Sequence, residues 1–399
     1  MKKYTVVKGD SLWRIASKLY GDGHKYKLIL EANREIIQDE RLIYTGQVFL
    51  IPDLIEVDRK IIDNNKLFIP GKEKDQLTIV IKGKEFEGFE NFRLNQAMDV
   101  IADGWNCSMA YNIKDKEIVD IFKPYSYNES LVYIGGNIID NGILYNVSPE
   151  LSQTKRIIKL EGWTKTADII DSVSSPPYEF SNMNIKDISK SILSPFSLDI
   201  IFDNDPGPVF DRVTIEPTES VGQFLANLAT QRGLLISSNE KGQLVFWTGT
   251  TSAPLFTLEE GGNYLLSIPA INYDGRSIFN TYKAIGQSPG NSSNSAISID
   301  NEIPKVRKMT FTADDTTDAN IKDSADWKRD KARADSFNIS LQVSGWRDPN
   351  GNLYKKNTRM ILKSETAGFP DGINLLIKAV EFSMSNSGKQ TTLSVVKKY

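Results

Sequence analysis

The sequence predicts an α+β protein of several domains, in which β-strands predominate. Short runs of β-type residues recur between Gly, Asn, Asp and Pro turns over most of the chain, and only a few segments show the 3.6-residue apolar spacing of a helix. The strand spacing favours a barrel or sandwich over a parallel α/β sheet. With 399 residues, the chain is long enough for two to four domains, each with its own core.

The N-terminal fifty residues predict the order strand, helix, helix, strand. A β-type run at 4–7 precedes a helix over 11–20, whose apolar residues recur at i, i+3, i+4 and i+7 from Leu12 to Leu19. Asp10 or Ser11 can cap this helix. A second helix is predicted over about 24–33, and a strand over 48–51.

The run YTVVKGDSLWRIASKLYGDGHKYKLILEAN, followed by LIYTGQVFLIP, resembles the LysM family over residues 4–52. One departure is Thr45, where the family usually has proline, although Gly46 is kept for the turn. The resemblance implies a shallow groove for N-acetylated sugars of peptidoglycan or chitin. By resemblance, the groove is formed by Gly9, Asp10, Ser11 and Leu12 facing Leu42, Ile43 and Tyr44. These residue types do not require a glycan, because Asp10 and Ser11 can serve as helix caps and Ile43 can be a core residue. Contact with a partner protein is therefore the alternative role for this surface.

Beyond this segment we expect a LysM domain over 1–54, a charged linker over 55–76 and a first β-rich domain over 77–175. The β-type runs that define the first β-rich domain are 77–81, 106–111, 117–122, 131–134, 142–147 and 156–160.

A module that mixes helices and strands is predicted over 176–264. Asn184 can cap a helix that must stop before Ser194-Pro195, since the residue before a proline disfavours the helical region. A second helix over 221–232 is capped by Ser220 and closed by Gly233, and a hairpin follows it.

A second β-rich domain is predicted over 265–399. Its polar segment 287–298 is a candidate flexible loop, and 318–335 can form a helix. In that helix Lys322 with Asp326, and Lys331 with Asp335, are placed at i, i+4, which is typical of a solvated face.

His24 and Cys107 are the single histidine and the single cysteine, which excludes zinc sites built from several His and Cys ligands and excludes intrachain disulfides. No metal or other cofactor is predicted. His24 is interpreted as a surface residue and Cys107 as a core residue, so a cysteine peptidase is not expected. Glycosidase chemistry needs only two carboxylates and stays open. Asn128-Glu129-Ser130 resembles the Glu-Ser of lytic transglycosylases, but Glu129 precedes a β-type run instead of ending a helix.

The net charge of −3 supplies no global positive field, so non-specific nucleic-acid binding is not expected, and no sequence-specific nucleic-acid partner is predicted. No run of 18 apolar residues predicts a membrane span, and the first residues do not predict a signal peptide.

From about residue 77 to 399 the chain resembles the baseplate hub proteins of Mu-like contractile-tailed phages. The resemblance is carried by LEGWTKTADIIDS, ISKSILSPFSLDIIFD, EPTESVGQFLANLATQRGLLISSNEKGQLVF and SGWRDPNGNLYKKNTRMILK, in that order. It implies a homotrimeric ring of β-barrel-like domains related to the tail-tube fold, with an intervening α+β module. The ring would surround a channel between the tail tube and the membrane-piercing spike.

The function predicted from both resemblances is a structural, non-enzymatic baseplate hub of a contractile phage tail or tailocin. Such a protein would be assembled in the host cytoplasm and located in the virion. Its partners would be itself, the spike, the tube and wedge or sheath-proximal proteins, with the LysM domain as a clamp to these neighbours or as a peptidoglycan contact. The alternative is a glycan-binding tail protein with cell-wall hydrolase activity.

Overall fold

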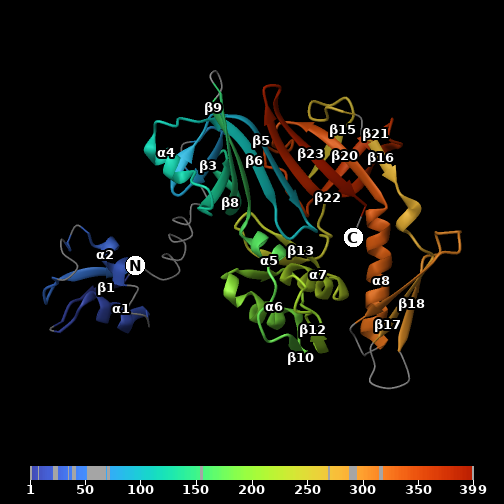
Figure 1. Cartoon of the computed structure of the whole chain (residues 1–399), viewed down its shortest axis with the longest axis horizontal. Helices are drawn as coiled ribbons and strands as arrows, with labels where there is room; N and C mark the ends of the chain where they lie inside the picture. Colours follow the sequence, from blue (N-terminus) through green and yellow to red (C-terminus); the bar gives the residue numbers. More distant parts are fainter. Residues whose placement is uncertain are drawn as a thin grey trace. The chain divides into compact units, whose positions relative to one another are not determined.

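The computed structural model describes residues 2–7, 9–20, 26–34, 36–37, 42–51, 69, 72–152, 156–267, 270–286, 294–313 and 318–397. The chain divides into two compact units, Met1–Lys72 and Glu73–Tyr399 (Figure 1). His24, most of the predicted linker 55–76 and most of the predicted loop 287–298 lie outside the described residues.

The first unit has the predicted order of strand, helix, helix and strand: β1 (Lys2–Thr5), α1 (Leu12–Tyr20), α2 (Tyr26–Ala32) and β2 (Val48–Ile51). The two strands pair antiparallel. Ile15, Ala16, Ile29 and Phe49 form the centre of the core. Leu19 was expected on the apolar stripe of α1 but is exposed, because the stripe turns away from the core in the last turn of this short helix.

Asn33 links α2 to β2 in the core of the first unit. Its buried side-chain amide donates to the carbonyl oxygens of Ile29 and Leu50, at 2.7 and 2.8 Å, and accepts the Leu50 N–H at 2.7 Å. These bonds satisfy backbone groups that would otherwise be buried without partners. The asparagine that ends the second helix therefore has a structural role.

The second unit is organised around one 13-stranded sheet, shown in the upper part of the unit in Figure 1. Its hydrogen-bonded order is β16-β20-β23-β22-β5-β6-β9-β8-β7-β3-β4, with β21 joined to β22 and β15 joined to β21. The bounds are β3 (Leu77–Ile81), β4 (Lys84–Phe86), β5 (Phe89–Ala97), β6 (Gly104–Ala110), β7 (Glu129–Ile134), β8 (Asn137–Leu151), β9 (Arg156–Thr164), β15 (Phe256–Glu259), β16 (Ala270–Tyr273), β20 (Phe337–Ser344), β21 (Arg359–Ser364), β22 (Phe369–Ser385) and β23 (Gly388–Val396).

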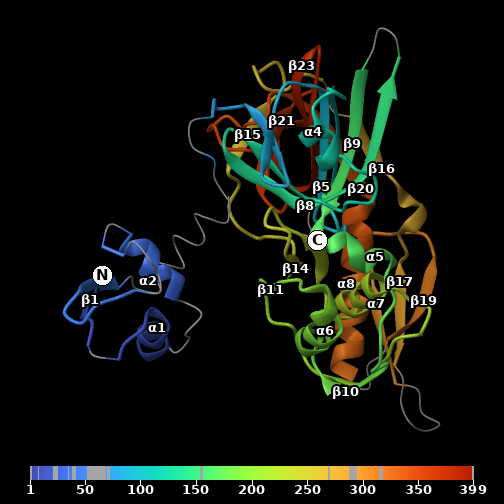
Figure 2. The ribbon, with the colours of Figure 1, turned by 60° about the vertical axis from the view of Figure 1, so that its left-hand side comes forward.

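This strand order joins the two predicted β-rich domains. The middle connection is the antiparallel pair of β5 with β22, and one hydrophobic core contains side chains from both halves. Among the described residues the strand path is open and does not close into a barrel. The α+β class is confirmed. Figure 2 shows that the β8–β9 hairpin extends beyond its neighbouring strands.

The α+β module lies below the sheet in Figure 1. It contains α5 (Asp168–Asp171), β10 (Glu179–Met183), α6 (Ile185–Leu193), β11 (Ile200–Phe202), β12 (Phe210–Thr214), α7 (Val221–Gln231), β13 (Leu235–Ser238) and β14 (Leu244–Trp247), with 3₁₀ turns at Lys165–Ala167 and Ser194–Phe196. Asn184 and Ser220 accept N–H bonds at the starts of α6 and α7, as predicted. The core of the module extends from Ile169 to Phe246, whereas β15 belongs to the large sheet.

A smaller sheet of β17 (Thr281–Gly286), β18 (Ser295–Ile299) and β19 (Lys308–Ala313) has the order β18-β17-β19, and a 3₁₀ turn at Gly275–Ser277 precedes it. The helix α8 (Asp318–Asp335) packs against it through Ile321 and Ala325. Both predicted i, i+4 ion pairs of α8 are present, at 2.6 Å each.

One predicted strand is wrong. Residues 117–122 are mainly α4 (Lys116–Ile121), because the Asp115 carboxylate accepts the N–H groups of Glu117 and Ile118 and caps a helix. The cap turns Ile121 and Phe122 into the core, where both are buried. A run of β-branched residues was therefore overruled by a local hydrogen bond.

Candidate functional site

The predicted LysM groove begins at the turn before α1. Gly9 has a positive φ of 94°, and the Asp10 carboxylate accepts the Tyr4 hydroxyl and the Val7 N–H, both at 2.9 Å. Ser11 Oγ accepts the Arg14 N–H at 3.2 Å and caps α1. Both polar side chains therefore hold the turn in shape.

The other groove residues divide into core and surface. Leu12 is only 2% exposed and Ile43 packs against the core, whereas Leu42 is exposed and Tyr44 is 64% exposed. The turn at Thr45 and Gly46 is bonded to the residue that follows β1, since the Gly46 N–H donates to the Val6 carbonyl at 2.8 Å. This bond holds Tyr44 near the end of the strand that leads into Gly9.

Trp13 is a surface residue that the sequence reasoning did not select. It follows Leu12 in the first turn of α1 and is half exposed. Its position outside the apolar stripe of the helix could have indicated a contact surface, because a large aromatic side chain away from the core buries little area when the domain folds. Trp13, Leu42 and Tyr44 are thus exposed apolar side chains close to the predicted groove in sequence, and so is Val7.

A buried ion pair lies in the second unit, where the large sheet meets the α+β module. Lys356 Nζ donates to the two Asp103 carboxylate oxygens at 2.7 and 2.9 Å, to Ser237 Oγ at 2.9 Å and to the Ala97 carbonyl at 3.0 Å. The side chains of Lys356 and Asp103 are 8% and 0% exposed. We call this set the joint, because it links the end of β5, the β13 strand and the segment before β21.

Further bonds complete the joint. The Asp103 N–H donates to Thr164 Oγ1 at 3.0 Å and to Ser238 Oγ at 3.3 Å, and the Asp103 carboxylate accepts the Ala97 N–H at 3.1 Å. Burial raises the pKa of the Asp103 carboxyl, and the Lys356 ammonium and these hydrogen bonds oppose that rise. Nothing in the sequence distinguished Lys356 from a surface lysine.

Asp140 on β8 is a second fully buried carboxyl near the joint. Among the described residues it has no hydrogen-bond partner. Burial is the main cause that raises the pKa of Asp140 well above its ordinary value, and the nearby Asp103 carboxyl raises this pKa further. The Lys356 ammonium has the opposite, smaller effect and lowers it. Asp140 is therefore held in its neutral form at pH values where an exposed aspartate is ionised.

The variant Asp140→Asn is expected to flatten the pH dependence of stability. Because the pKa of Asp140 is raised in the folded state, the unfolded chain binds fewer protons once the pH exceeds about 4, so folding loses free energy as the pH rises. Relative to wild type, the free energy of unfolding of the variant should increase by up to about 1.4 kcal/mol for each pH unit above about 4. Urea unfolding at pH 4, 5.5 and 7 measures this gain.

Asp120→Asn serves as the control for this experiment. Hydrogen bonds from Lys123 and Lys82 lower the pKa of Asp120 to about 2, so in the folded protein this carboxyl titrates below the pH range of the experiment. This control should therefore follow the wild-type slope between pH 5 and 7. An Asp140→Asn variant with that same slope would contradict the buried, neutral assignment.

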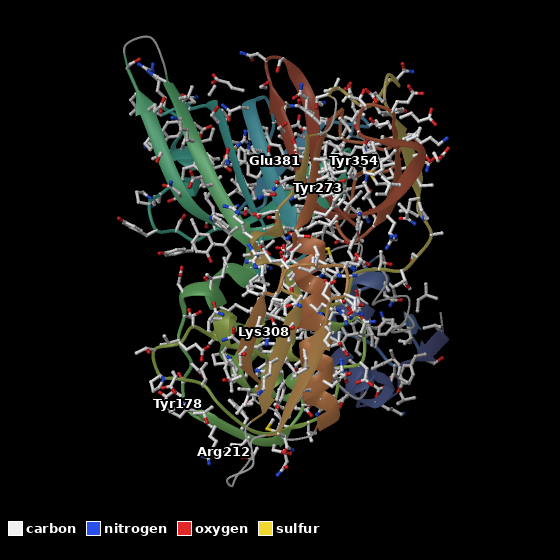
Figure 3. The ribbon with its side chains drawn as sticks, turned by 90° about the vertical axis from the view of Figure 1, so that its right-hand side faces the viewer. Tyr178, Arg212, Tyr273, Lys308, Tyr354 and Glu381 are labelled. Atoms are coloured by element: carbon white, nitrogen blue, oxygen red, sulfur yellow. The ribbon has the colours of Figure 1, made fainter. Side chains whose placement is uncertain are left out.

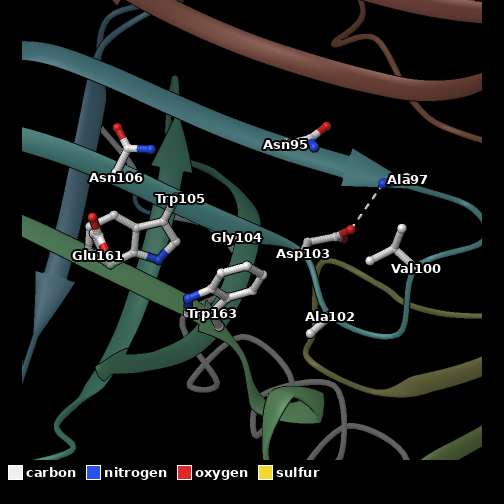
Figure 4. Close-up of a pocket in the computed structure, with 10 residues that line it drawn as sticks. All are labelled: Asn95, Ala97, Val100, Ala102, Asp103, Gly104, Trp105, Asn106, Glu161 and Trp163. Atoms are coloured by element: carbon white, nitrogen blue, oxygen red, sulfur yellow. Dashed lines mark hydrogen bonds between the residues drawn. The ribbon is translucent and has the colours of Figure 1, made fainter. Parts of the chain in front are cut away.

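A cavity of about 390 Å³ opens beside the joint (Figure 4). Two tryptophans on neighbouring strands shape it: Trp163 of β9 covers Gly104 of β6, while Trp105 of β6 covers Gly162 of β9. The first tryptophan is 43% exposed and the second is 2% exposed. The lining residues are Asn95, Ala97, Val100, Ala102, Asp103, Gly104, Trp105, Asn106, Glu161 and Trp163.

The two acidic side chains that line the cavity, Asp103 and Glu161, have structural partners. Asp103 is paired with Lys356, and the Glu161 carboxylate accepts the Asn146 amide at 3.2 Å. Glu129 belongs to the segment that resembles the Glu-Ser of lytic transglycosylases. It is the first residue of β7 and forms an ion pair with Lys165 at 2.7 Å. This strand position does not match the helix-ending glutamate of those enzymes.

Cys107 is buried in the large core, and burial raises the pKa of its thiol, as expected for a packing residue. Within the described part of the chain, no group of three or more His, Cys, Asp or Glu side chains could hold a metal ion. The features described so far are a structural joint with a cavity beside it and a set of exposed apolar side chains.

Comparisons with known proteins identify the family of individual domains. Three family models match the chain: the LysM domain at residues 4–52, the second domain of gp44-like baseplate hub proteins at 166–248 and the fourth domain of the Mu phage baseplate assembly protein GpP at 317–398.

Relatives that match two thirds or more of the chain extend this result. The baseplate hub protein gp44 of Escherichia phage Mu is 23% identical, over 66% of this chain and 73% of that protein. The 43 kDa tail protein of prophage MuSo2 from Shewanella oneidensis is 25% identical, with a TM-score of 0.70 over 81% of this chain and 98% of that one. The c3393 protein of E. coli, a type VI secretion component, shares the fold, with 12% identity, a TM-score of 0.51 and coverage of 80% of this chain and 77% of that one.

The chain is thus a phage-type baseplate hub or tail protein with an N-terminal LysM domain. The resemblances to the LysM family and to the hubs of Mu-like phages are confirmed. None of the described helices has the length and apolar character needed to span a bilayer.

Proposed function

We propose that the chain is the homotrimeric baseplate hub that joins the tail tube to the central spike. The observation that carries this proposal is the similarity to a phage Mu baseplate hub protein over 73% of its length, together with hub-type domain models at 166–248 and 317–398. The protein would be assembled in the host cytoplasm as a virion component and would have no enzymatic activity.

The open sheet supports assembly into a ring. Its path ends at β16 and β4, and such terminal strands present backbone N–H and C=O groups that can pair with another chain. In a closed ring of identical subunits, neighbouring copies can cover these edges.

For the LysM domain we propose a clamp role, in which it contacts wedge or sheath-proximal baseplate proteins through the predicted groove. Exposed Leu42 and Tyr44, together with Trp13, offer apolar area suited to a protein interface. Gly9, Asp10 and Ser11 would shape the surface, while buried Leu12 and half-buried Ile43 would support it from the core. Peptidoglycan contact is the alternative occupant of this groove.

Two measurements test the hub proposal: the solution mass by analytical ultracentrifugation, and the turbidity of a purified peptidoglycan suspension after addition of the protein. We expect a trimer that leaves the turbidity unchanged. A monomer at all accessible concentrations would contradict the hub. Clearing of the suspension would favour the alternative of a glycan-binding tail protein with hydrolase activity.

For the LysM groove, the variant Tyr44→Ala should keep the trimer mass, and neither it nor the wild type should sediment with purified peptidoglycan. The tyrosine side chain is 64% exposed, so its removal leaves the core intact. Leu19→Ala, an exposed apolar position at the end of α1, is the matched control. Wild-type binding to peptidoglycan that Tyr44→Ala abolishes and Leu19→Ala retains would replace the clamp with a glycan site.

A further inference from the structure

The small sheet β18-β17-β19 has one covered and one uncovered face. Its covered face carries Tyr282, Ala284 and Ser298, which are buried; Ser298 Oγ donates to the Asp326 carboxylate on α8 at 2.6 Å. The opposite face contains two cross-strand rows, Ile299–Thr281–Lys308 and Ile297–Lys283–Thr310. We call these six residues the β17 face. It lies on the side of the unit shown in Figure 3, where Lys308 is labelled.

The β17 face combines exposed apolar area with positive charge. Ile297 is 48% exposed and Ile299 is 57% exposed, which is unusual for two isoleucines of one strand. Within the described part of the chain, neither Lys283 nor Lys308 has an ion-pair partner. The face therefore presents two unpaired ammonium groups beside apolar side chains.

A second exposed surface has the opposite charge. We call this surface the α5 patch, and it consists of Asp168, Ile170, Asp171, Val173 and Glu219. The first four are exposed, and Glu219 is half-buried. The bridge between Val173 and Ser220 brings Glu219 beside Val173, so the two segments form one surface.

The three carboxylates of the α5 patch have only neutral hydrogen-bond partners within the described residues. Asp168 accepts the Tyr145 hydroxyl at 2.5 Å, and Glu219 accepts the Asn227 amide at 3.1 Å. The patch is thus the chemical complement of the β17 face: apolar side chains beside negative charge instead of positive charge. The two surfaces belong to separate parts of the unit, because α5 packs on α7 whereas β17 and β18 pack on α8 (Figure 1).

We propose that the β17 face of one copy docks on the α5 patch of the next copy. This inference rests on the proposed trimer and deepens it by naming the contact between subunits. Because the two surfaces differ, the contact is heterologous, and a heterologous contact that closes gives a ring. Two like faces would instead place lysines against lysines or carboxylates against carboxylates, which is unfavourable at an interface.

Charge reversal tests the contact in the full-length chain. One variant carries Lys283→Glu and Lys308→Glu, a second carries Asp171→Lys and Glu219→Lys, and a third carries all four changes. At a concentration where the wild type is trimeric, the first two should sediment at about one third of the wild-type mass, because each sets like charges against each other. The four-change variant restores opposite charges and should recover the trimer.

Lys186→Glu with Lys190→Glu on α6 is the matched control, since it makes the same change in net charge at two other exposed lysines and should stay trimeric. A wild-type trimer that survives both pair reversals would overturn this inference and leave the proposed hub intact. Loss of the trimer without recovery in the four-change variant, or equal loss in the control, would also overturn it. A monomeric wild type would overturn the trimer and the inference together.

Cysteine cross-linking provides a readout that does not depend on charge. The native Cys107 is buried, so Ile297→Cys on the β17 face and Val173→Cys on the α5 patch supply the accessible thiols. Under mild oxidation, the variant with both cysteines should give covalent trimers on a non-reducing gel, and each single-cysteine variant should not. Covalent dimers from the Ile297→Cys variant alone, without trimers from the double variant, would show that like faces meet and would overturn the proposal.

Discussion

Replacing Lys356 with methionine is expected to lower the free energy of unfolding of the second unit by about 3–5 kcal/mol. Lys356 is the cation of the joint and is paired with the fully buried Asp103 at 2.7 Å. Its removal leaves the Asp103 carboxylate buried without a compensating charge, and it takes away the hydrogen bonds that Lys356 Nζ donates to Ser237 Oγ and to the Ala97 carbonyl. The stem of methionine can fill much of the space, so the loss reports mainly the missing charge and hydrogen bonds.

Urea unfolding at pH 7, followed by tryptophan fluorescence, measures this loss. Lys355→Met is the matched control, because Lys355 is exposed in the same segment and should change stability by less than about 0.5 kcal/mol. Adding Asp103→Asn to Lys356→Met should recover part of the loss, since it removes the unpaired carboxyl. Equal stabilities of Lys356→Met and Lys355→Met would contradict the structural importance of the joint.

Trp105→Ala is the second substitution for which we expect a large effect, about 3–5 kcal/mol. The indole is 2% exposed and lies in the core shared by the two halves of the large sheet. It covers Gly162 on β9, where a Cβ atom would overlap the ring, so the directly paired residue has no side chain to fill the space left behind. The variant should therefore contain a cavity as well as lose buried area.

Trp163→Ala provides the comparison within the same pair of strands. Trp163 covers Gly104 in the mirrored arrangement, but it is 43% exposed, so its removal should cost less than half as much. Thermal unfolding followed by circular dichroism gives both values. If the two tryptophan variants were equally destabilised, the assignment of Trp105 to the shared core would be wrong.

The parts of the fold that the sequence predicted correctly depend on local signals. The turns and helices of the LysM domain, the Ser220 cap of α7 and the ion pairs of α8 each depend on residues that are only a few positions apart in the sequence. The predicted strand at 117–122 failed because one capping carboxylate, Asp115, outweighs β-branched composition over so short a segment.

The joint and the union of the β-rich halves could not be predicted, for a different reason. Lys356 meets Asp103 across 253 residues of sequence, and neither residue lies in a motif. The paired residues of β5 and β22 are even farther apart in sequence, and no local pattern specifies their pairing. In the LysM groove, sequence spacing selected Tyr44, which is exposed, but could not separate it from Leu12, which is core.

The position of β22 in the strand order has a consequence for biosynthesis. Strands β3 to β9 leave the ribosome about two hundred residues before β22, and until then β5 has an unpaired edge at the centre of the future sheet. A chain that is terminated early therefore exposes that edge to other nascent chains. Synthesis of β22 is the step that covers this edge, so the N-terminal half of the sheet depends on a strand made about two hundred residues later to avoid mispairing.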